Sequence, residues 1–105
     1  MEYISVDELH NRIQNLDSGD LILDVRTPEE FQTGHIQGAQ NTPHEEVVSI
    51  AGNLKQFKTV YVHCKMGGRA KVAAQALQAS GLNNIVCVGD GGMARWVEMG
   101  WVLEE

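Results

Sequence analysis

The sequence predicts an α/β domain in which a central, mostly parallel sheet of five strands carries helices on both faces. Short apolar runs alternate with segments of helical periodicity along the chain, which is the pattern of a parallel sheet covered by helices. The chain has 105 residues, of which 43% are apolar, so residues 1–105 are expected to form a single domain with one modest core. Charged residues make up 21% and there are only two prolines, a composition that argues against disorder.

The first third of the chain predicts two strands, each followed by a helix. Residues 3–4 form a short strand, and a capping box at residues 5–8 opens a helix whose apolar residues recur at helical spacing. Residues 21–25 are a buried strand that follows a polar turn. The segment 27–30 (Thr-Pro-Glu-Glu) supplies an N-cap, an N1 proline and a capping glutamate for a short helix that ends near Gly34.

The middle of the chain continues this alternation. Residues 39–41 predict a brief strand, and residues 42–45 (Thr-Pro-His-Glu) repeat the capping signature ahead of a helix that runs to Ile50. Residues 59–63 (Thr-Val-Tyr-Val-His) predict the central strand.

The last third predicts the longest helix and the final strand. Residues 69–80 are rich in alanine and are followed by Gly81, a pattern typical of a well-formed helix and its end. Residues 85–88 form the last strand. Residues 89–92 (Gly-Asp-Gly-Gly) are expected to be a flexible loop before a short helix that contains Trp96.

Cys64 occupies an unusual electrostatic position, between the central strand and a glycine-rich turn into the longest helix. The glycines let the backbone N–H groups point inward, and the following helix presents its positive end to the same place. Lys65 and Arg69 add positive charge. These features favour the thiolate, the nucleophilic form of cysteine, so the loop predicts sulfur or oxyanion chemistry.

Polar or glycine residues follow two other predicted strands. Asp24 lies at the end of the 21–25 strand and Gly89 follows the 85–88 strand. Ligand sites in parallel sheets lie beyond the carboxyl ends of the strands, so Asp24, Cys64 and Gly89 are expected to border one crevice.

Composition and charge exclude several other functions. The net charge of −6 leaves no basic stripe to follow nucleic acid, so any anion site must be local. The four histidines lack a common metal-ligand spacing, and no metal site is predicted. The sequence shows neither a signal peptide nor a membrane-spanning window, so we expect a cytoplasmic protein without membrane contact, in which both cysteines are reduced thiols.

Four stretches of the chain are informative in combination: residues 23–31, 34–41, 62–70 and 89–96. Any one of them is a weak signal, but all four occur in order and at specific spacings. Together they resemble the signature segments of the single-domain rhodaneses, a family of sulfurtransferases, over nearly the whole chain. The fold of that family, a parallel sheet flanked by helices, agrees with the alternation of strands and helices.

The resemblance implies that Cys64 takes a sulfane sulfur from a donor and holds it as a persulfide. The donor is expected to be thiosulfate or a persulfide, and the acceptor cyanide, a thiol or a thioredoxin-like protein. No cofactor is implied, and the sequence leaves the oligomeric state open. The N–H groups expected to cradle the bound sulfur belong to Lys65, Met66, Gly67, Gly68 and Arg69.

Three positions depart from the family pattern. Ala70 stands where a hydroxyl residue is frequent, so one hydrogen bond to the bound sulfur is expected to be absent. Met66 replaces a small or polar residue and predicts a more apolar acceptor surface. Asp90 adds a negative charge to the closing loop, and the sequence does not indicate whether it faces the pocket.

Two other functions stay open at this point. Cysteine phosphatases and some arsenate reductases use a similar cradle, but with five residues between cysteine and arginine. Here only residues 65–68 separate Cys64 from Arg69, and no aspartate lies within or just after the loop to act as general acid. The second alternative is a sulfur carrier or binding module without turnover. Inactive domains of the family usually lack the cysteine, so the presence of Cys64 argues against an inert domain.

Several polar residues also have purely structural interpretations. Cys87 lies in the middle of an apolar strand and is expected to pack in the core. Asp24 and Arg26 are expected to form an ion pair that braces the crevice, with Arg26 also a candidate for contact with substrate. His35 is expected to fix the 34–38 turn by hydrogen bonding. Trp96 and Trp101 are expected to pack in the core or at its edge, with Trp96 near the pocket rim.

Overall fold

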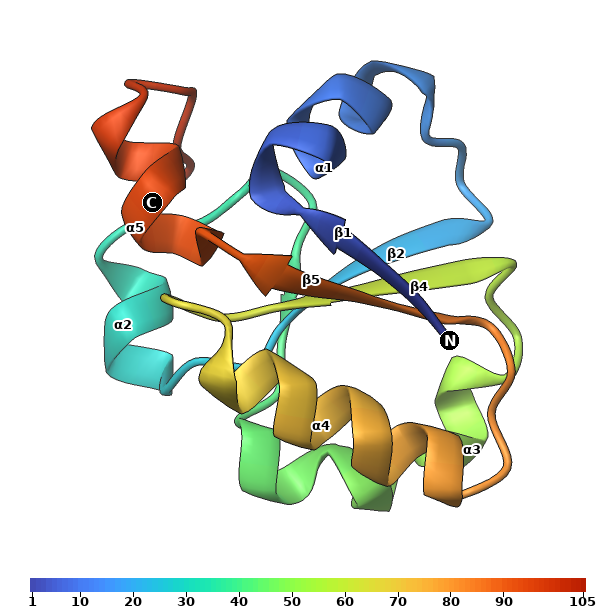
Figure 1. Cartoon of the computed structure of the whole chain (residues 1–105). Helices are drawn as coiled ribbons and strands as arrows, with labels where there is room; N and C mark the ends of the chain where they lie inside the picture. The colour runs from blue at the N-terminus through green and yellow to red at the C-terminus, as the bar shows by residue number, and fades with distance from the viewer.

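A computed structural model describes all residues, 1–105, and shows one five-stranded sheet, all parallel, in the order β1-β5-β4-β2-β3 (Figure 1). This architecture confirms the predicted fold class. The strands are β1 (Glu2–Ser5), β2 (Asp20–Asp24), β3 (Gln40–Asn41), β4 (Thr59–His63) and β5 (Ile85–Asp90). The helices are α1 (Val6–Arg12), α2 (Pro28–Gln32), α3 (Ala51–Leu54), α4 (Gly68–Ala79) and α5 (Gly92–Glu98), with two 3₁₀ segments, η1 (Ile13–Asn15) and η2 (His44–Ile50).

Helices cover both faces of the sheet, and each face has its own core. In Figure 1, α3 and α4 lie on one side of the sheet and α1 and α5 on the other. Because successive strand side chains point to opposite faces, β4 sends Val60 and Val62 toward α4 and Tyr61 toward α1 and α5. The same alternation continues beyond Val62, so the side chains of His63 and Cys64 lie on opposite faces of the sheet. None of the helices has the length and apolar character required to cross a membrane.

The segment after β3 differs from the prediction. His44–Ile50 is a 3₁₀ helix rather than an α-helix, and Pro43 precedes it without a side-chain capping bond. The N–H of Thr42 donates to the carbonyl of Asp24 at 3.0 Å, and that of His44 to the carbonyl of Val25 at 3.0 Å. These bonds hold the start of the segment at the end of β2. No side chain caps the segment, so the predicted cap is wrong.

The final strand is longer than predicted. β5 continues to Asp90, because Ser5 of β1 pairs with Asp90 after an irregularity in register. Gly91 and Gly92, with φ of 84° and 39°, make the turn into α5. The expected flexible loop is therefore wrong for Gly89 and Asp90, which belong to the sheet.

Candidate active site

The thiol of Cys64 accepts hydrogen bonds from two backbone amides of the loop that follows β4. The N–H of Gly67 donates to Sγ at 3.0 Å and that of Ala70 at 3.3 Å. Gly67 has a φ of 115°, which lets the chain curl back over the sulfur before α4 begins at Gly68. Cys64 is only 1% exposed, so the sulfur lies at the bottom of this cradle.

Four further amides of the cradle have no partner within the protein. None of the N–H groups of Lys65, Met66, Gly68 and Arg69 donates a hydrogen bond to another part of the chain. Two of them belong to the first turn of a helix, where amides lack intrahelical partners. The loop therefore has both the bonded donors and the spare donors that an additional sulfur anion requires.

The start of α5 holds the same loop from outside. The N–H of Met93 donates to the carbonyl of Cys64 at 2.9 Å, and that of Ala94 to the carbonyl of Lys65 at 3.0 Å. In a planar trans peptide the C=O and N–H point in opposite directions. Since the carbonyls are bound by α5, the N–H groups of Lys65 and Met66 point away from α5.

Two glycines allow this close packing of backbone on backbone. A Cβ on Gly67 would overlap the carbonyl group of Gly89, and a Cβ on Gly92 would overlap the carbonyls of Cys64 and Lys65. Both glycines also have positive φ. Glycine is therefore required at these two positions for two reasons: the backbone is left-handed, and there is no space for a side chain.

The charge of Arg69 is matched by Glu30, a partner that the sequence did not predict. The guanidinium donates to both carboxylate oxygens, at 2.6 and 3.0 Å. Arg69 and the hydrogen bonds within the Thr27 cap lower the pKa of Glu30 to about 2. Glu30 caps α2 and also anchors the first turn of α4, so the cation beside the loop is not a free charge.

Asp24 and Arg26 form the predicted ion pair. Arg26 donates through Nε at 3.0 Å and through Nη2 at 2.7 Å to the two carboxylate oxygens of Asp24, and through Nη2 at 2.8 Å to the carbonyl of Gly34. Both side chains are almost fully buried. Asp24 pairs in register with His63, so its carboxylate lies on the opposite face of the sheet from Sγ. The structure therefore does not bring Asp24 to the sulfur.

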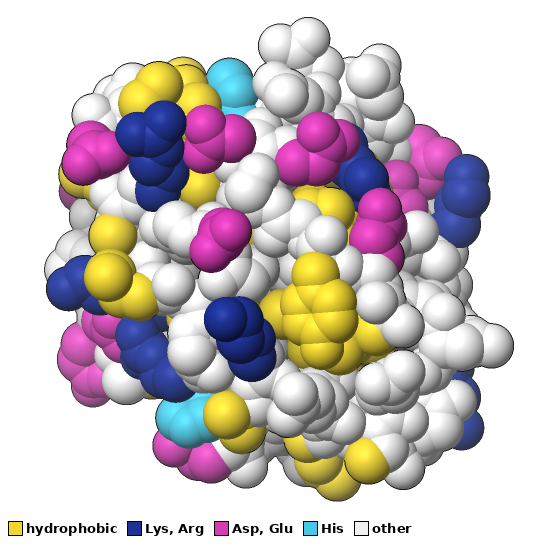
Figure 2. Space-filling model, viewed as in Figure 1, with side chains coloured by type: hydrophobic (Ala, Val, Ile, Leu, Met, Phe, Trp, Pro, Cys, Tyr) yellow, Lys and Arg dark blue, Asp and Glu magenta, His cyan; other side chains and the backbone are white.

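Lysine and arginine have different roles in this molecule. Every arginine lies in an ion pair with a carboxylate, whereas no lysine does. On the face shown in Figure 2, basic side chains are interspersed with acidic ones. Lys65 is exposed in the loop after Cys64, beside Met66, which is 69% exposed. The loop thus presents one unpaired cation and one apolar side chain to solvent.

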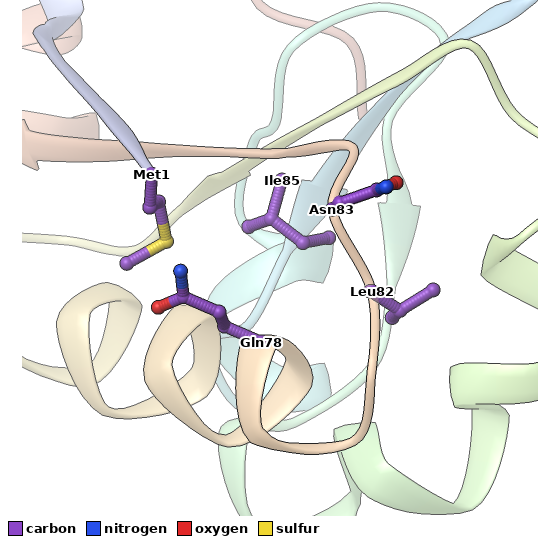
Figure 3. Close-up of a pocket in the computed structure, with 5 residues that line it drawn as sticks. All are labelled: Met1, Gln78, Leu82, Asn83 and Ile85. Carbon is purple, nitrogen blue, oxygen red and sulfur yellow. The ribbon is translucent and has the colours of Figure 1, made fainter.

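A groove of about 280 Å³ borders the loop after β4, and both charged and apolar residues line it. Its lining comes from the loop, from the α2 region and from α5: Arg26, Glu30, Thr33, Lys65, Met93, Ala94 and Val97. Another cavity, of about 120 Å³, lies between the end of α4 and the start of β5 (Figure 3). That cavity is at the amino ends of the strands, so it is remote from Cys64.

The remaining predicted residues have structural positions. Cys87 is fully buried, and burial raises the pKa of its thiol. His35 bonds the carbonyl of Phe31 at 2.9 Å and the carboxylate of Glu104 at 3.3 Å, so it ties the chain terminus to the turn. Trp96 is 3% exposed and donates through Nε1 to the carbonyl of Val102. Packing in the core is confirmed for Cys87 and Trp96.

Sequence reasoning missed three groups near the loop. The amide of Ala70 binds Sγ, but a backbone donor leaves no trace in the residue type. Glu30 shows only its capping role in the sequence, because its partner Arg69 is distant along the chain. His63 is 0% exposed with no hydrogen-bond partner for Nε2, and its only signal is a polar residue at the end of an apolar strand.

Comparison with known proteins agrees with this fold. The sequence profile of the rhodanese-like domain matches residues 5–99. The chain therefore belongs to the rhodanese-like domain family. YqhL of Bacillus subtilis is 36% identical over 75 residues, which cover 71% of this chain and 59% of YqhL. Thiosulfate sulfurtransferase 16 of Arabidopsis thaliana is 33% identical over 98 residues, with 79% of this chain and 78% of the relative covered.

A solved structure also has a similar fold. A protein of Staphylococcus saprophyticus with a known crystal structure is 33% identical, with a TM-score of 0.83 and 100% of both chains covered. The chain spans 59% of the length of YqhL and less than half the length of several other relatives.

Proposed function

We propose that this protein is a sulfurtransferase that carries sulfane sulfur on Cys64. The observation that carries the proposal is the bonding at Sγ: two amides already donate to it, and four more amides of the same loop have no partner. Such donors stabilise an anion without any need to reorganise at the moment of reaction. The match to a rhodanese-like domain, and a relative named as a thiosulfate sulfurtransferase, support the same chemistry.

In the first proposed step the Cys64 thiolate attacks the outer sulfur of thiosulfate. The new S–S bond makes a persulfide anion on Cys64, and the S–S bond of thiosulfate breaks to release sulfite with its electron pair. In the second step a thiolate or cyanide attacks the terminal sulfur and leaves as a persulfide or thiocyanate, which restores the Cys64 thiolate. No net oxidant or reductant is required. A persulfide from another protein would replace thiosulfate as donor in the same scheme.

The setting of the loop suits a small anionic donor and a thiol acceptor, either free or on a thioredoxin-like protein. Lys65 supplies an exposed, unpaired ammonium group for anion attraction. Met66 offers an apolar contact of the kind that protein acceptors use. We place this activity in the cytoplasm.

Phosphatase or arsenate reductase chemistry is less well supported. The ring between Cys64 and Arg69 is one residue shorter than in those enzymes, and the guanidinium of Arg69 is engaged by Glu30. A tetrahedral oxyanion would have to compete with that carboxylate for the guanidinium. Assays with an aryl phosphate and with arsenate distinguish the classes, and robust turnover of either would contradict the proposed function.

Intact mass measurement after thiosulfate treatment is the direct test. We expect the mass to rise by one sulfur atom, to return to its starting value with cyanide, and to stay unchanged in Cys64→Ala. The Cys87→Ala variant is the matched control, because it also lacks one thiol but should still gain the sulfur. If Cys64 gains the sulfur atom but the protein does not turn over repeatedly, the protein is a sulfur carrier without turnover. If no sulfur is gained, the proposal is wrong.

A further inference from the structure

His63 is the last residue of β4 and is completely buried beside the catalytic loop. Its Nδ1 lies 3.5 Å from the carbonyl oxygen of Cys64, and its Nε2 lies 3.9 Å from Oδ2 of Asp24. Nε2 has no hydrogen-bond partner. Buried polar atoms are nearly always bonded, so an unpartnered ring nitrogen in this position calls for an explanation.

The buried ring is neutral at physiological pH. Burial lowers the pKa of His63, and the attraction of Asp24 opposes that effect only in part. Arg26 already compensates the charge of Asp24 through a bidentate contact. One ring nitrogen of His63 therefore carries a proton and the other a lone pair.

Only one tautomer gives the ring a hydrogen bond. A proton on Nδ1 points at the carbonyl of Cys64, within reach of a long hydrogen bond. A proton on Nε2 would face Asp24 at 3.9 Å, too far for a bond, at an oxygen that already accepts from Arg26 at 2.7 Å. It would also leave the lone pair of Nδ1 against the lone pairs of the Cys64 carbonyl.

We propose that neutral His63 carries its proton on Nδ1 and acts as a positioning residue for the Cys64–Lys65 peptide. The carbonyl of this peptide then accepts from two donors, His63 and the N–H of Met93. A carbonyl polarised by two donors makes the N–H on the other side of its peptide a stronger donor. That N–H belongs to Lys65 and is one of the spare amides of the cradle. The inference rests on the proposed function because this amide serves the bound sulfur.

The tautomer is measured directly on the unaltered protein. The ¹⁵N chemical shifts of the imidazole nitrogens distinguish a protonated from an unprotonated ring nitrogen. For ¹⁵N-labelled protein at neutral pH, we expect the proton of His63 on Nδ1. A proton on Nε2, or a doubly protonated ring, would overturn the inference. This outcome is independent of whether the protein transfers sulfur.

Three substitutions test the effect on Cys64. His63→Asn places an amide nitrogen near the position of Nδ1, His63→Gln places one near Nε2, and His63→Phe has neither. We expect the Gln and Phe variants to slow alkylation of Cys64 by iodoacetamide at neutral pH by about fivefold, the effect of one modest hydrogen bond, and Asn to restore the rate to within about twofold.

A purely structural role would give a different pattern. If His63→Phe reacts as fast as the unaltered protein, or if His63→Asn is as slow as His63→Phe, the positioning role is refuted. Thermal melting of each variant separates slow reaction from misfolding. The ring measurement on the unaltered protein decides the tautomer even where a variant fails to fold.

Discussion

Arg69 of α4 binds Glu30 of α2 through two parallel hydrogen bonds, 2.6 and 3.0 Å long. The same carboxylate accepts from the backbone and hydroxyl of Thr27 at the start of α2. Glu30 therefore joins two helices that border the Cys64 loop and compensates the positive charge next to it. This pair gives two predictions, one on stability and one on reactivity.

The stability contributed by Glu30 should disappear in acid. Its pKa of about 2 is below the unfolded value of about 4.3, so the contribution is present above pH 4.3 and is lost as pH falls through 2. Because the pair is about one-third exposed, we expect no more than about 1 kcal/mol. Urea unfolding from pH 6 to 2 should show the free-energy gap between the unaltered protein and Glu30→Gln closing toward pH 2. Glu29→Gln, which removes a carboxylate that forms no ion pair in the same helix turn, should show no such gap.

The same pair should make two charge substitutions act in opposite directions on Cys64. Glu30→Gln leaves the Arg69 cation uncompensated and should raise the alkylation rate at neutral pH. Arg69→Gln leaves the Glu30 carboxylate and should lower it, each by about two- to fivefold at low salt. Added salt should shrink both effects because the groups are partly exposed. Changes of the same sign in both variants would show that the charges do not act on the thiol.

Two neighbouring glycines should respond very differently to alanine. Gly67 has a positive φ and no space for a Cβ, whereas a Cβ on Gly68 would meet nothing within 4 Å. We expect Gly67→Ala to lose about 3 kcal/mol or more of unfolding free energy, or to fail to fold. Gly68→Ala should be neutral or stabilising by up to about 1 kcal/mol. Equal melting temperatures for the two variants would contradict the backbone contacts described for the loop.

Breaking the buried ion pair should cost far more than breaking an exposed one. Asp24→Ala leaves the guanidinium of Arg26 buried without a counter-charge, and we expect a loss of about 3–5 kcal/mol in urea unfolding. Asp7→Ala removes an exposed contact of Arg95 and should cost less than about 1 kcal/mol. Similar losses in both variants would mean that Arg26 finds water or another partner once Asp24 is removed.

The fold was predictable from the sequence because local patterns and tertiary structure agree. The apolar runs at 21–25 and 59–63 form neighbouring strands of the sheet, buried on both faces as their continuous apolar character predicts. The backbone turn of the loop after Cys64 was predictable for a similar reason. A cysteine after a strand, followed by two glycines and a helix, allows few backbone paths.

What the sequence did not predict depends on contacts between distant residues or on the backbone alone. The 44–50 segment is a 3₁₀ helix. Backbone bonds from Thr42 and His44 to the end of β2 hold its start, and a capping pattern does not reveal such contacts. Glu30 and Arg69 are 39 residues apart in the chain. Ala70 contributes through its N–H, and that group is present in almost every residue type.

The hydrogen bonds from α5 to the loop after β4 have a consequence for biosynthesis. Met93 and Ala94 bind the carbonyls of Cys64 and Lys65, yet they are translated long after those residues. A growing polypeptide on the ribosome therefore exposes Cys64 before the groups that arrange its amides exist. The loop after β4 can therefore take its final form only once residues 92–98 have emerged, late in synthesis.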